Sequence, residues 1–497
     1  MIRPARQWLL ALCFWVSASA AAAQEAEQVF EGVLTRADHG AYREIAFDVP
    51  PETARLYIEI IYERGEPWAA IDMAVYDTQR FRGASIFSKT LIDIGEYDAT
   101  PSYLPGPLPE GRWRLVLGGA NAPEGRETPY SVRIRAERRG RSAPAFARMV
   151  RDAPGWYRGD FHAHTGHSDG YCTALSGARA PCPVFRTLEA AAARGLDFIA
   201  VTDHNTVSHL QSLRELSAYF DTLAIIAAQE VTTYRGHMNV FGPAAPIEFR
   251  LGAAQAPDVE TLAAHVSALG GVLSINHPGI SLSEGCPGCG WSAPVTDYAG
   301  VAAVEVVNGV VAGWGEGPEG PASSLPFWIA RLNEGRRIAA IGGSDNHTPT
   351  DTETLSSVGG PSTVVYAATL SPADILAGVR AGHVFIDVEG VRERFLALTA
   401  TRGHRSAMMG ETIAAARGAL VSFAVETHGA PEGARLEIWR DGAPFETDAD
   451  DAPLAANETR RFSWRSDGAR HWFSANVRAE DGRLILIGNP IYINFPS

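Results

Sequence analysis

The sequence predicts an α/β region between two β-rich regions. Short strand-like segments dominate both ends of the chain, strand-like and helix-like segments alternate in the middle, and most histidines lie in that middle part. The chain has 497 residues, too many for one ordinary domain of roughly 100–200 residues. Hydrophobic residues make up 46% and charged residues 20% of the sequence, which excludes wholesale disorder.

The charge balance narrows the classes of partner. The formal net charge is -14, which argues against nucleic acid or an anionic membrane surface as the main partner. Lys89 is the only lysine, so a lysine Schiff base or a lysine P-loop is nearly excluded elsewhere in the chain. We therefore expect a small-molecule partner; the sequence does not decide the oligomeric state.

Residues 1-23 have the parts of a cleavable export signal. Arg3 and Arg6 form a positive start, Trp8 to Val16 is a short apolar run, and Ala21 to Ala23 is a small-residue cleavage site. We expect cleavage after Ala23 and a periplasmic or secreted protein; an uncleaved anchor is the alternative. The apolar run is shorter than the roughly 20 residues that a membrane-spanning helix needs, so we expect no stable membrane insertion.

Four cysteines remain after the signal: Cys172, Cys182, Cys286 and Cys289. An even count in an exported chain favours disulfides, and the local pairing joins Cys172 to Cys182 and Cys286 to Cys289. Sequence does not choose among the pairings, and a redox pair at Cys286 and Cys289 or a four-cysteine zinc site are alternatives. We expect the loop from Ser281 to Asp297 to form a disulfide-stiffened wall of a pocket, because long irregular loops are often functional.

The first expected unit after the signal is a β-sandwich over residues 24-148. Tyr42 to Phe47, Arg55 to Ile61 and Arg112 to Leu117 are short, rich in β-forming residues and partly alternating. Turn sequences such as Pro105-Gly106-Pro107 separate such segments, which is typical of a small sandwich.

Residues 149-391 change character. Apolar runs that predict strands alternate with segments of helical periodicity, which indicates a parallel sheet or a barrel. The strand-like runs are Phe198 to Val201, Ala224 to Ala228, Val272 to Ile275, Val304 to Val307 and Ile338 to Ile341. The helix-like segments are Val184 to Arg194, Val259 to Leu269 and Ala322 to Asn333.

Residues 392-497 return to β character, and we expect a second sandwich there. Leu420 to Glu426, Ala434 to Trp439 and Trp472 to Val477 are the clearest strands. Asp441-Gly442, just after the second of these segments, is a hairpin-turn signal.

Histidine and carboxylate residues recur where the predicted strands of the middle region end. His162 and His164 are two residues apart, so in an extended segment both rings face one side and can reach one metal. Strand ends in a β/α barrel converge on one face, so we expect the remaining candidates to meet there as well. These side chains are too many for one tetrahedral site, so we expect two or three metals. The remaining candidates are Asp169, His204, Glu230, His237, His277, Asp345 and His347.

The ordered motifs resemble the PHP (polymerase and histidinol phosphatase) metal-dependent hydrolases over roughly residues 156-390. The matching motifs are His162-Ala-His164-Thr, Ser168-Asp169-Gly170, Thr202-Asp203-His204, Glu230, His277-Pro278 and Ser344-Asp345-Asn346-His347. The resemblance implies a distorted barrel of seven β/α units, (β/α)7, flanked here by the two sandwiches. The signal and the β-rich flanks look like the carbaryl-hydrolase-like branch of this superfamily.

The resemblance also implies up to three divalent metal ions, for which zinc, manganese and iron are candidates given imidazole and carboxylate ligands. Its ligand sets are His162, His164 and Asp345 for the first metal, Glu230 as a bridge, His237 and His277 for the second, and Asp169, His204 and His347 for the third.

The expected chemistry is attack by a hydroxide held between two metals, which lower the pKa of bound water. It would attack phosphorus in line, or carbon at a carbonyl, while the metals hold the developing oxyanion. His167 and Asp203 are candidate proton donors for the leaving group, and Arg235 is a candidate phosphate clamp.

Each of these roles has a plainer alternative. Asp203 is more readily explained as a carboxylate that orients His204. His167 is also compatible with a solvated position in a loop, and Arg235 with an ion pair at the surface. Asn308 is expected to cap a turn rather than to contact substrate. His209 lies in a helix-like segment and is expected to be structural.

The leading functional hypothesis is an exported metal-dependent phosphoesterase. The second is a hydrolase of carbamate, ester or amide bonds with the same site, and the two differ in whether the pocket carries arginine clamps. The third is a non-catalytic glycan-binding or adhesion protein, since two β-sandwiches are common in such proteins; a complete set of ligand-type residues argues against it.

Overall fold

The computed structural model of the protein describes residues 27–138, 148–283, 287–315, 317–447 and 452–496. Strands outnumber helices, and the fold is mixed α/β with several sheets. No helix in these ranges is long and apolar enough to cross a membrane. The expected export signal and its cleavage site lie outside the described residues.

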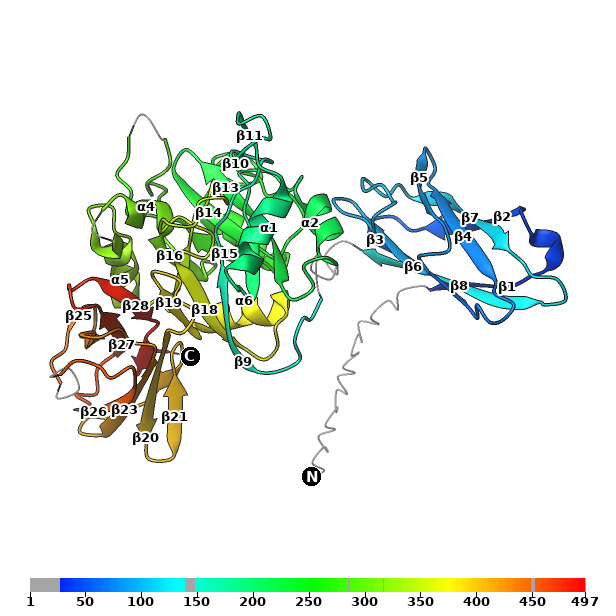
Figure 1. Ribbon diagram of the computed structural model, residues 1–497. Helices are drawn as coiled ribbons and strands as arrows, with labels where there is room; N and C mark the ends of the chain where they lie inside the picture. Colours follow the sequence, from blue (N-terminus) through cyan, green and yellow to red (C-terminus); the bar gives the residue numbers. More distant parts are fainter. Residues whose placement is uncertain (1–26, 139–147, 284–286, 316, 448–451, 497) are drawn as a thin grey trace, which may run out of the picture.

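The N-terminal region consists of two antiparallel four-stranded sheets that share one core (Figure 1). Its elements are β1 (Gln28–Leu34), η1 (Arg36–Asp38), β2 (Tyr42–Val49), β3 (Thr53–Tyr62), β4 (Ala70–Tyr76), β5 (Phe81–Ser85), β6 (Leu91–Gly95), β7 (Gly111–Asn121) and β8 (Thr128–Arg138). The sheet orders are β1-β8-β3-β6 and β2-β7-β4-β5. Alternate residues such as Ile58, Leu115 and Val132 point into the core, so this region has the expected sandwich arrangement.

The sandwich contacts the middle region through helix α2 (Leu210–Leu216). The backbone N–H of Ala99 donates to Gln211 Oε1 at 2.9 Å, and Arg214 forms a 2.6 Å ion pair with Asp93. Tyr97 also packs against the apolar cluster that contains Leu210. The sandwich is therefore attached to the helix that follows the Asp203-His204 motif.

The middle region contains one path of nine strands, in the order β17-β16-β15-β14-β13-β12-β9-β18-β19, and a separate short hairpin. The path strands are β9 (Gly155–Asp160), β12 (Phe198–Val201), β13 (Ala224–Thr233), β14 (Gly236–Phe241), β15 (Val272–Ile275), β16 (Ala303–Asn308), β17 (Ala339–Gly343), β18 (Ser362–Ala367) and β19 (Val384–Asp387). The hairpin strands are β10 (Tyr171–Thr173) and β11 (Arg179–Pro181). The five expected strand-like runs lie in β12, β13, β15, β16 and β17, whose buried faces explain their continuous apolar character.

The helices of the middle region lie between these strands. They are α1 (Val184–Ala193), α2, α3 (Val259–Ala268), α4 (Gly309–Gly313), η2 (Gly317–Glu319), α5 (Leu325–Asn333) and α6 (Pro372–Ala381). The expected segments correspond to α1, α3 and α5, and α2 follows His209, which was expected in a helix-like segment. Helices α4 and α6 were not among the expected segments. Asp258 caps α3 by accepting from the Thr261 N–H at 2.8 Å, and Gly382 ends α6 at φ +74°.

Strict strand–helix alternation is broken at β14, which pairs antiparallel with both β13 and β15. The pairs β9–β12, β12–β13, β15–β16 and β16–β17 are parallel. Beyond β17 the chain returns to the segment after β9: His164 N–H donates to Asn346 O, and Asp345 N–H donates to His162 O, each at 2.8 Å. The parallel strand ends therefore meet, while a barrel of seven β/α units stays a prediction.

The C-terminal region continues the sheet of the middle region, because β19 pairs antiparallel with β28. Its strands are β20 (Phe395–Arg402), β21 (Arg405–Met408), β22 (Thr412–Ile413), β23 (Leu420–His428), β24 (Arg435–Arg440), β25 (Ala443–Pro444), β26 (Asn457–Arg465), β27 (His471–Arg478), β28 (Leu484–Gly488) and β29 (Ile491–Ile493). A second sheet, β21-β20-β23-β26, packs on it through a core that joins Phe385 of β19 to Phe423 and Phe473. Asp441 and Gly442 form the β24–β25 turn with positive φ, as their sequence predicts.

Candidate metal centre

The first group of ligand-type side chains joins the segment after β9 to the segment after β17. His162 Nε2 lies 3.3 Å and His164 Nε2 lies 2.9 Å from Asp345 Oδ1. Both histidines are fully buried. The ligand atoms of the three residues lie within 4.8 Å of one another, so the group expected for the first metal is assembled in the folded chain.

The second group lies beside the first. Glu230 Oε1 is 3.3 Å from His237 Nδ1 and 3.6 Å from His277 Nε2, and the three side chains are buried. Asn276 Nδ2 donates to the same carboxylate oxygen at 2.9 Å. Glu230 was expected just beyond a strand; it lies inside β13 instead, because that strand runs on into the β13–β14 hairpin that carries His237.

Glu230 also faces the first group. Its Oε2 atom lies 3.5 Å from His162 Nε2 and 3.7 Å from His164 Nε2. The same oxygen lies 2.8 Å from His204 Nδ1. One buried carboxylate thus stands between the two groups, as expected for a residue that bridges two cations.

The third group forms the exposed edge of the site. Asp169 Oδ2 lies 3.6 Å from His204 Nε2 and 3.3 Å from His347 Nε2. The side chain of Asp169 is 55% exposed and that of His347 is 30% exposed. His164 also belongs to this group by distance, which the sequence did not indicate. Solvent therefore reaches the centre from the side of the third group.

Two supporting residues on β16 were not assigned to the site from the sequence. Glu305 Oε1 lies 2.8 Å from His162 Nδ1, and Glu305 Oε2 accepts from the His277 N–H at 3.1 Å. Asn308 Nδ2 donates to Glu305 at 3.0 Å and to Asp345 Oδ2 at 3.1 Å. Asn308 also caps α4, as expected, by accepting from the Val311 N–H. A carboxylate inside an otherwise apolar strand was the signal that could have identified Glu305.

Two ligand-type residues have a backbone conformation that non-glycine residues rarely adopt. His277 has φ +28° and Asp345 has φ +53°. Hydrogen bonds hold both: His277 N–H donates to Glu305, and Asp345 N–H donates to the His162 carbonyl. Such strain persists only where surrounding contacts fix it, and it is concentrated at functional sites.

The buried atoms of this cluster are incompletely paired. Among the described residues, His162 Nε2, His164 Nδ1 and Glu230 Oε2 are buried without a hydrogen bond of acceptable geometry, although His204 Nδ1 lies close to Glu230 Oε2. Most buried polar atoms in proteins have a partner. A cation between these residues would supply one, so the donor set fits divalent metal ions.

The electrostatics lead to the same conclusion. Burial lowers the pKa of His162, but Asp345, Glu305 and Glu230 outweigh it and raise that pKa well above its ordinary value. Burial raises the pKa of Glu230, but His162 and His204 outweigh it and hold that pKa well below its ordinary value. Burial also lowers the pKa of His204, yet Glu230 and Asp169 raise it to about 10. The carboxylates are therefore ionised and attract positive charge into a buried site.

The Asp203 carboxylate is buried and paired within the adjoining loop. Its carboxylate accepts from Thr165 N–H at 2.8 Å, from Thr165 Oγ1 at 2.6 Å and from Ser168 Oγ at 2.6 Å. It also lies 3.3 Å from the Nδ1 atom of buried His209. Burial raises the pKa of Asp203, but His209 and the two hydroxyls lower it overall, so the group is an ionised acceptor. Within the described residues the Asp203 side chain holds the loop from Thr165 to Ser168 and does not touch the His204 ring. Its expected roles, as a proton donor or as a carboxylate that orients His204, stay predictions.

The other two candidate catalytic residues are exposed. His167 lies in the exposed part of the loop from Thr165 to Ser168, and its Nδ1 atom is 2.8 Å from Ser208 Oγ. Arg235 lies in the turn between β13 and β14, and no residue in the described ranges forms a hydrogen bond or ion pair with its guanidinium. The roles of His167 as a proton donor and of Arg235 as a phosphate clamp stay predictions.

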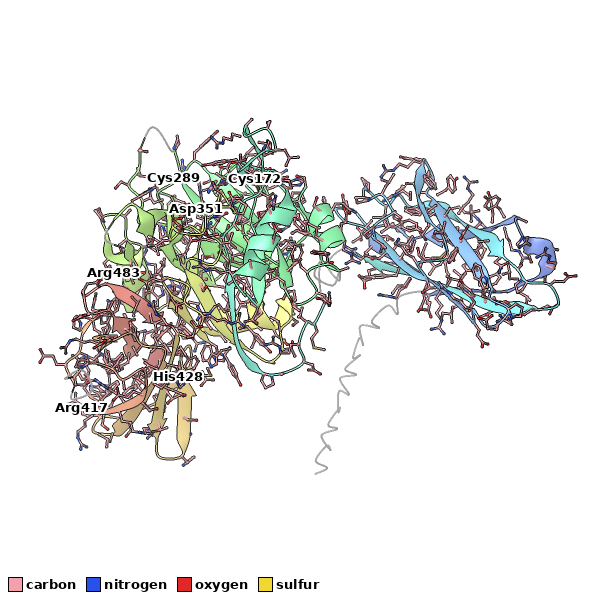
Figure 2. The ribbon with its side chains drawn as sticks, viewed as in Figure 1. Cys172, Cys289, Asp351, Arg417, His428 and Arg483 are labelled. Carbon is pink, nitrogen blue, oxygen red and sulfur yellow. A yellow bond between two sulfur atoms is a disulfide. The ribbon has the colours of Figure 1, made fainter. Side chains whose placement is uncertain are left out.

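The two cysteine motifs lie at the same end of the middle region, away from the C-terminal region (Figure 2). Cys172 and Cys182 form the local disulfide that was expected. Cys286 lies outside the described residues, so its pairing with Cys289 stays a prediction. The Cys289 carbonyl lies 2.9 Å from His277 Nδ1, which places that part of the 281–297 loop against the second group.

Comparisons with known proteins leave the chain without an assigned family. No family model matches the sequence, and no curated protein matches it. Among solved structures, it is similar to a two-domain protein from Bacteroides vulgatus ATCC 8482 that contains a predicted PHP-like metal-dependent phosphoesterase, at 16% identity and a TM-score of 0.36. The match covers 71% of this chain and 98% of that chain. A TM-score this low does not assign the fold, so the functional interpretation depends on the three groups themselves.

Proposed function

We propose that the protein is a metal-dependent hydrolase that cleaves phosphate esters. The observation that carries the proposal is Glu230, a buried carboxylate shared by two groups of histidines. Cations held on the two sides of one carboxylate lie close together. In such sites, divalent cations supply a water nucleophile at neutral pH and stabilise charge on the attacking and leaving oxygens of an in-line displacement.

The residues of the chain would divide the remaining work by their burial. The buried groups built on His162 and Glu230 hold cations away from bulk water and fix their spacing. The exposed third group, with Asp169 and His347, lies where a substrate enters. His167, which is exposed on the adjoining loop and lies beside Ser208, would give a proton to a leaving group there.

The proposal extends to fold and compartment. We infer an exported PHP-type protein in which β9 and β12 to β17 form the distorted (β/α)7 barrel. Two observations support the barrel: these strands are neighbours in one continuous sheet, and backbone hydrogen bonds join the segment after β17 to the segment after β9. The Cys172–Cys182 disulfide supports an oxidising compartment.

A second candidate function is hydrolysis of carbamate, ester or amide bonds at the same centre. One observation favours it: Arg235 is exposed, and no side chain of the described residues holds its guanidinium toward the cluster. A phosphate site commonly uses an arginine that donates two hydrogen bonds to the phosphate oxygens, whereas a neutral carbonyl substrate needs no such arginine.

The test follows hydrolysis of p-nitrophenyl phosphate, its phosphodiester analogue and an aryl carbamate by the mature protein, with chelator or with added manganese or zinc. Metal-dependent cleavage of a phosphate ester supports the proposal. Carbamate cleavage without phosphate cleavage favours the second candidate. His164→Ala and Asp345→Ala should abolish turnover, and His404→Ala, an exposed histidine, is the matched control. Wild-type turnover by either site variant with its metal content intact would contradict the site assignment.

A further inference from the structure

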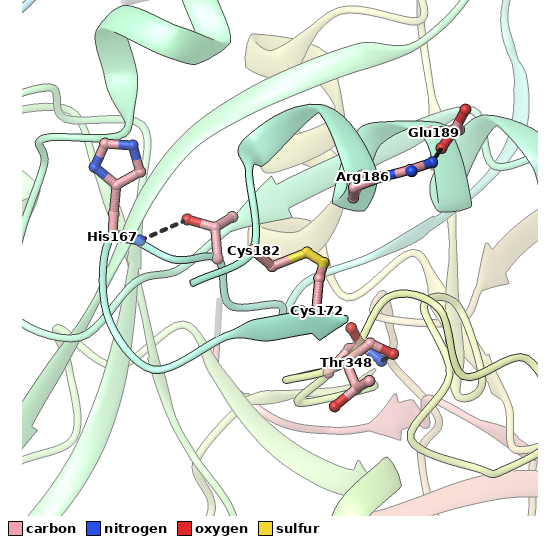
Figure 3. Close-up of a disulfide and its surroundings, with 8 residues drawn as sticks. His167, Cys172, Cys182, Arg186, Glu189 and Thr348 are labelled. Carbon is pink, nitrogen blue, oxygen red and sulfur yellow. Dashed lines mark hydrogen bonds and ion pairs between the residues drawn. A yellow bond between two sulfur atoms is a disulfide. The ribbon is translucent and has the colours of Figure 1, made fainter. Parts of the chain in front are cut away.

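The β10–β11 hairpin is closed by the Cys172–Cys182 disulfide (Figure 3), and its backbone is hydrogen-bonded to that of His347 in the third group. Both cysteines are buried, whereas Leu175 at the hairpin tip is fully exposed. The base of the hairpin, not its tip, therefore makes the contacts with the body of the protein. Figure 3 shows Thr348, the residue after His347, next to Cys172.

Cys182 closes the loop that carries Asp169. The Cys182 N–H donates to the Gly170 carbonyl at 2.9 Å, and the Gly166 N–H donates to the Cys182 carbonyl at 2.7 Å. These bonds tie both ends of the Gly166–Gly170 loop to one residue of the hairpin. The fit is close, because a Cβ atom on Gly166 would lie only 2.7 Å from the Cys182 nitrogen.

The other strand of the hairpin reaches a second residue of the third group. The Tyr171 N–H donates to the His347 carbonyl at 2.8 Å. The hairpin is thus hydrogen-bonded to the loop of Asp169 on one side and to the backbone of His347 on the other. The disulfide fixes the spacing between its two strands, since it joins Cys172, next to Tyr171, to Cys182.

Asp169 and His347 need this support more than Glu230 and His237 do. Glu230 and His237 lie within strands of the main sheet, whose ladders hold their backbones. Asp169 and His347 lie in irregular segments and have exposed side chains. Loops of this kind open more readily than buried strands unless something ties them down.

We propose that the disulfide-closed β10–β11 hairpin is a positioning element that sets the spacing of Asp169 and His347 and so completes the third cation group. This inference rests on the proposed function, because that proposal assigns cations to the cluster. It adds that the third group depends on a covalent feature outside the ligands.

The experiment compares manganese binding by wild-type protein, Cys172→Ser/Cys182→Ser and Asp169→Asn, by metal analysis after dialysis and by competition with a chelator. We expect the double variant to lose the weakest-bound manganese, or to bind it about 10–100-fold more weakly. Loss of a group that supports metal ligands typically lowers the affinity by this factor. The tighter sites should stay filled. Combining Asp169→Asn with the double variant should add little further loss, since both changes act on one site.

Matched variants separate positioning from general damage. Leu175→Ser alters the exposed hairpin tip and should bind manganese like the wild type. Gly166→Ala keeps the disulfide but pushes the loop away from Cys182, so it should lower the affinity for the same manganese ion. If the double variant does not fold, this variant tests the inference.

The outcomes also separate this inference from the proposed function. Wild-type protein that binds no manganese, zinc or iron would remove the basis of both. Wild-type protein that binds several cations, with the folded double variant and Gly166→Ala unchanged in every affinity, would overturn the inference alone.

Discussion

Glu230 determines the character of the centre at the scale of single residues. It is 1% exposed, yet its two oxygens face five histidines that come from four segments of the chain. An isolated buried carboxylate would be strongly destabilised in its ionised form. The surrounding imidazoles offset part of this cost, and cations would offset the rest. The cluster is therefore better suited to holding metal than to stabilising the fold.

Glu305 should tune the first group without being a ligand in it. Glu305→Gln removes the negative charge 2.8 Å from His162 Nδ1, so His162 should become a weaker ligand. We expect metal affinity to fall about 10–100-fold with little change in folding. Chelator competition measures the affinity, and Glu124→Gln, an exposed carboxylate of the N-terminal sandwich, is the control. Unchanged affinity in Glu305→Gln would show that this carboxylate has no supporting role.

His471 makes a separate, pH-dependent contribution to stability in the C-terminal region. Burial lowers the pKa of His471, but Asp441 Oδ2 at 2.5 Å and Asp467 Oδ2 at 3.0 Å outweigh it and raise that pKa. A group whose pKa is higher in the folded state stabilises the fold below its unfolded pKa of about 6.5, and this is lost as pH rises through the folded pKa.

His471→Gln should therefore lower the melting temperature more at pH 5.5 than at pH 9. The loss in the free energy of unfolding should be about 1 kcal/mol or less, because His471 and its two aspartate partners are partly exposed to solvent. His404→Gln, at an exposed position, should show no such pH dependence. An equal loss at both pH values would contradict the assignment.

The ligand-type residues were predictable from the sequence, but their supports were not. Histidines and carboxylates that follow apolar runs are visible in a linear pattern, and His162 and His164 show their common face by spacing alone. Asn308 and Asp203 depend on contacts with residues far away in the sequence: Asn308 with Asp345, and Asp203 with Thr165. No local pattern distinguishes such residues from turn or surface residues.

At the scale of elements, the buried apolar strands were predictable, whereas the β13–β14 hairpin and the covering of the outer edge of β17 were not. Fully buried strands such as β12 and β15 have continuous apolar sequences. The β13–β14 hairpin was missed because polar residues that face the centre, Glu230 in β13 and His237 in β14 among them, interrupt its apolar pattern. The edge of β17 is another feature without a sequence signal, since side chains rather than a strand cover part of it.

Asn489, from the turn after β28, covers that edge. Its Oδ1 atom accepts from the Ala340 N–H at 2.8 Å, and its Nδ2 atom donates to the Ala340 and Val384 carbonyls at 2.9 and 3.0 Å. Asn489→Ala leaves the buried Ala340 N–H and carbonyl unpaired, whereas the Val384 carbonyl keeps the backbone N–H of residue 489. We therefore expect a loss of about 2–4 kcal/mol in the free energy of unfolding. Urea denaturation measures it, with exposed Asn457→Ala as the control. A loss below about 0.5 kcal/mol, the usual size of a neutral surface change, would refute this role.

At the scale of the whole molecule, the middle region does not stand apart from its flanks. The C-terminal region extends its sheet through β28, and Asn489 reaches the strand that precedes Asp345. The N-terminal sandwich contacts α2, which follows the Asp203-His204 segment. The sequence predicted three regions from their changes in character. It could not predict a shared sheet, because strand pairing across a region boundary leaves no local pattern.

Metal removal should lower the stability of the whole protein. Ligands that bind only the folded state stabilise it, by about 2.7 kcal/mol per site at a concentration 100 times the Kd. We expect the melting temperature to fall with chelator and to recover when zinc or manganese is added back. His162→Ala should respond less, because part of the centre is gone. A melting temperature that is independent of metal would argue against structural coupling between the centre and the fold.

The most direct test of the account is the number of metal ions per chain in wild-type protein, Glu230→Ala and Asp169→Ala, after equilibration with one metal and removal of excess. Because Glu230 lies against histidines of all three groups and Asp169 belongs to only one, we predict that Glu230→Ala loses more metal than Asp169→Ala. Equal losses in the two variants, or the wild-type metal content in folded Glu230→Ala, would contradict a centre organised around this carboxylate.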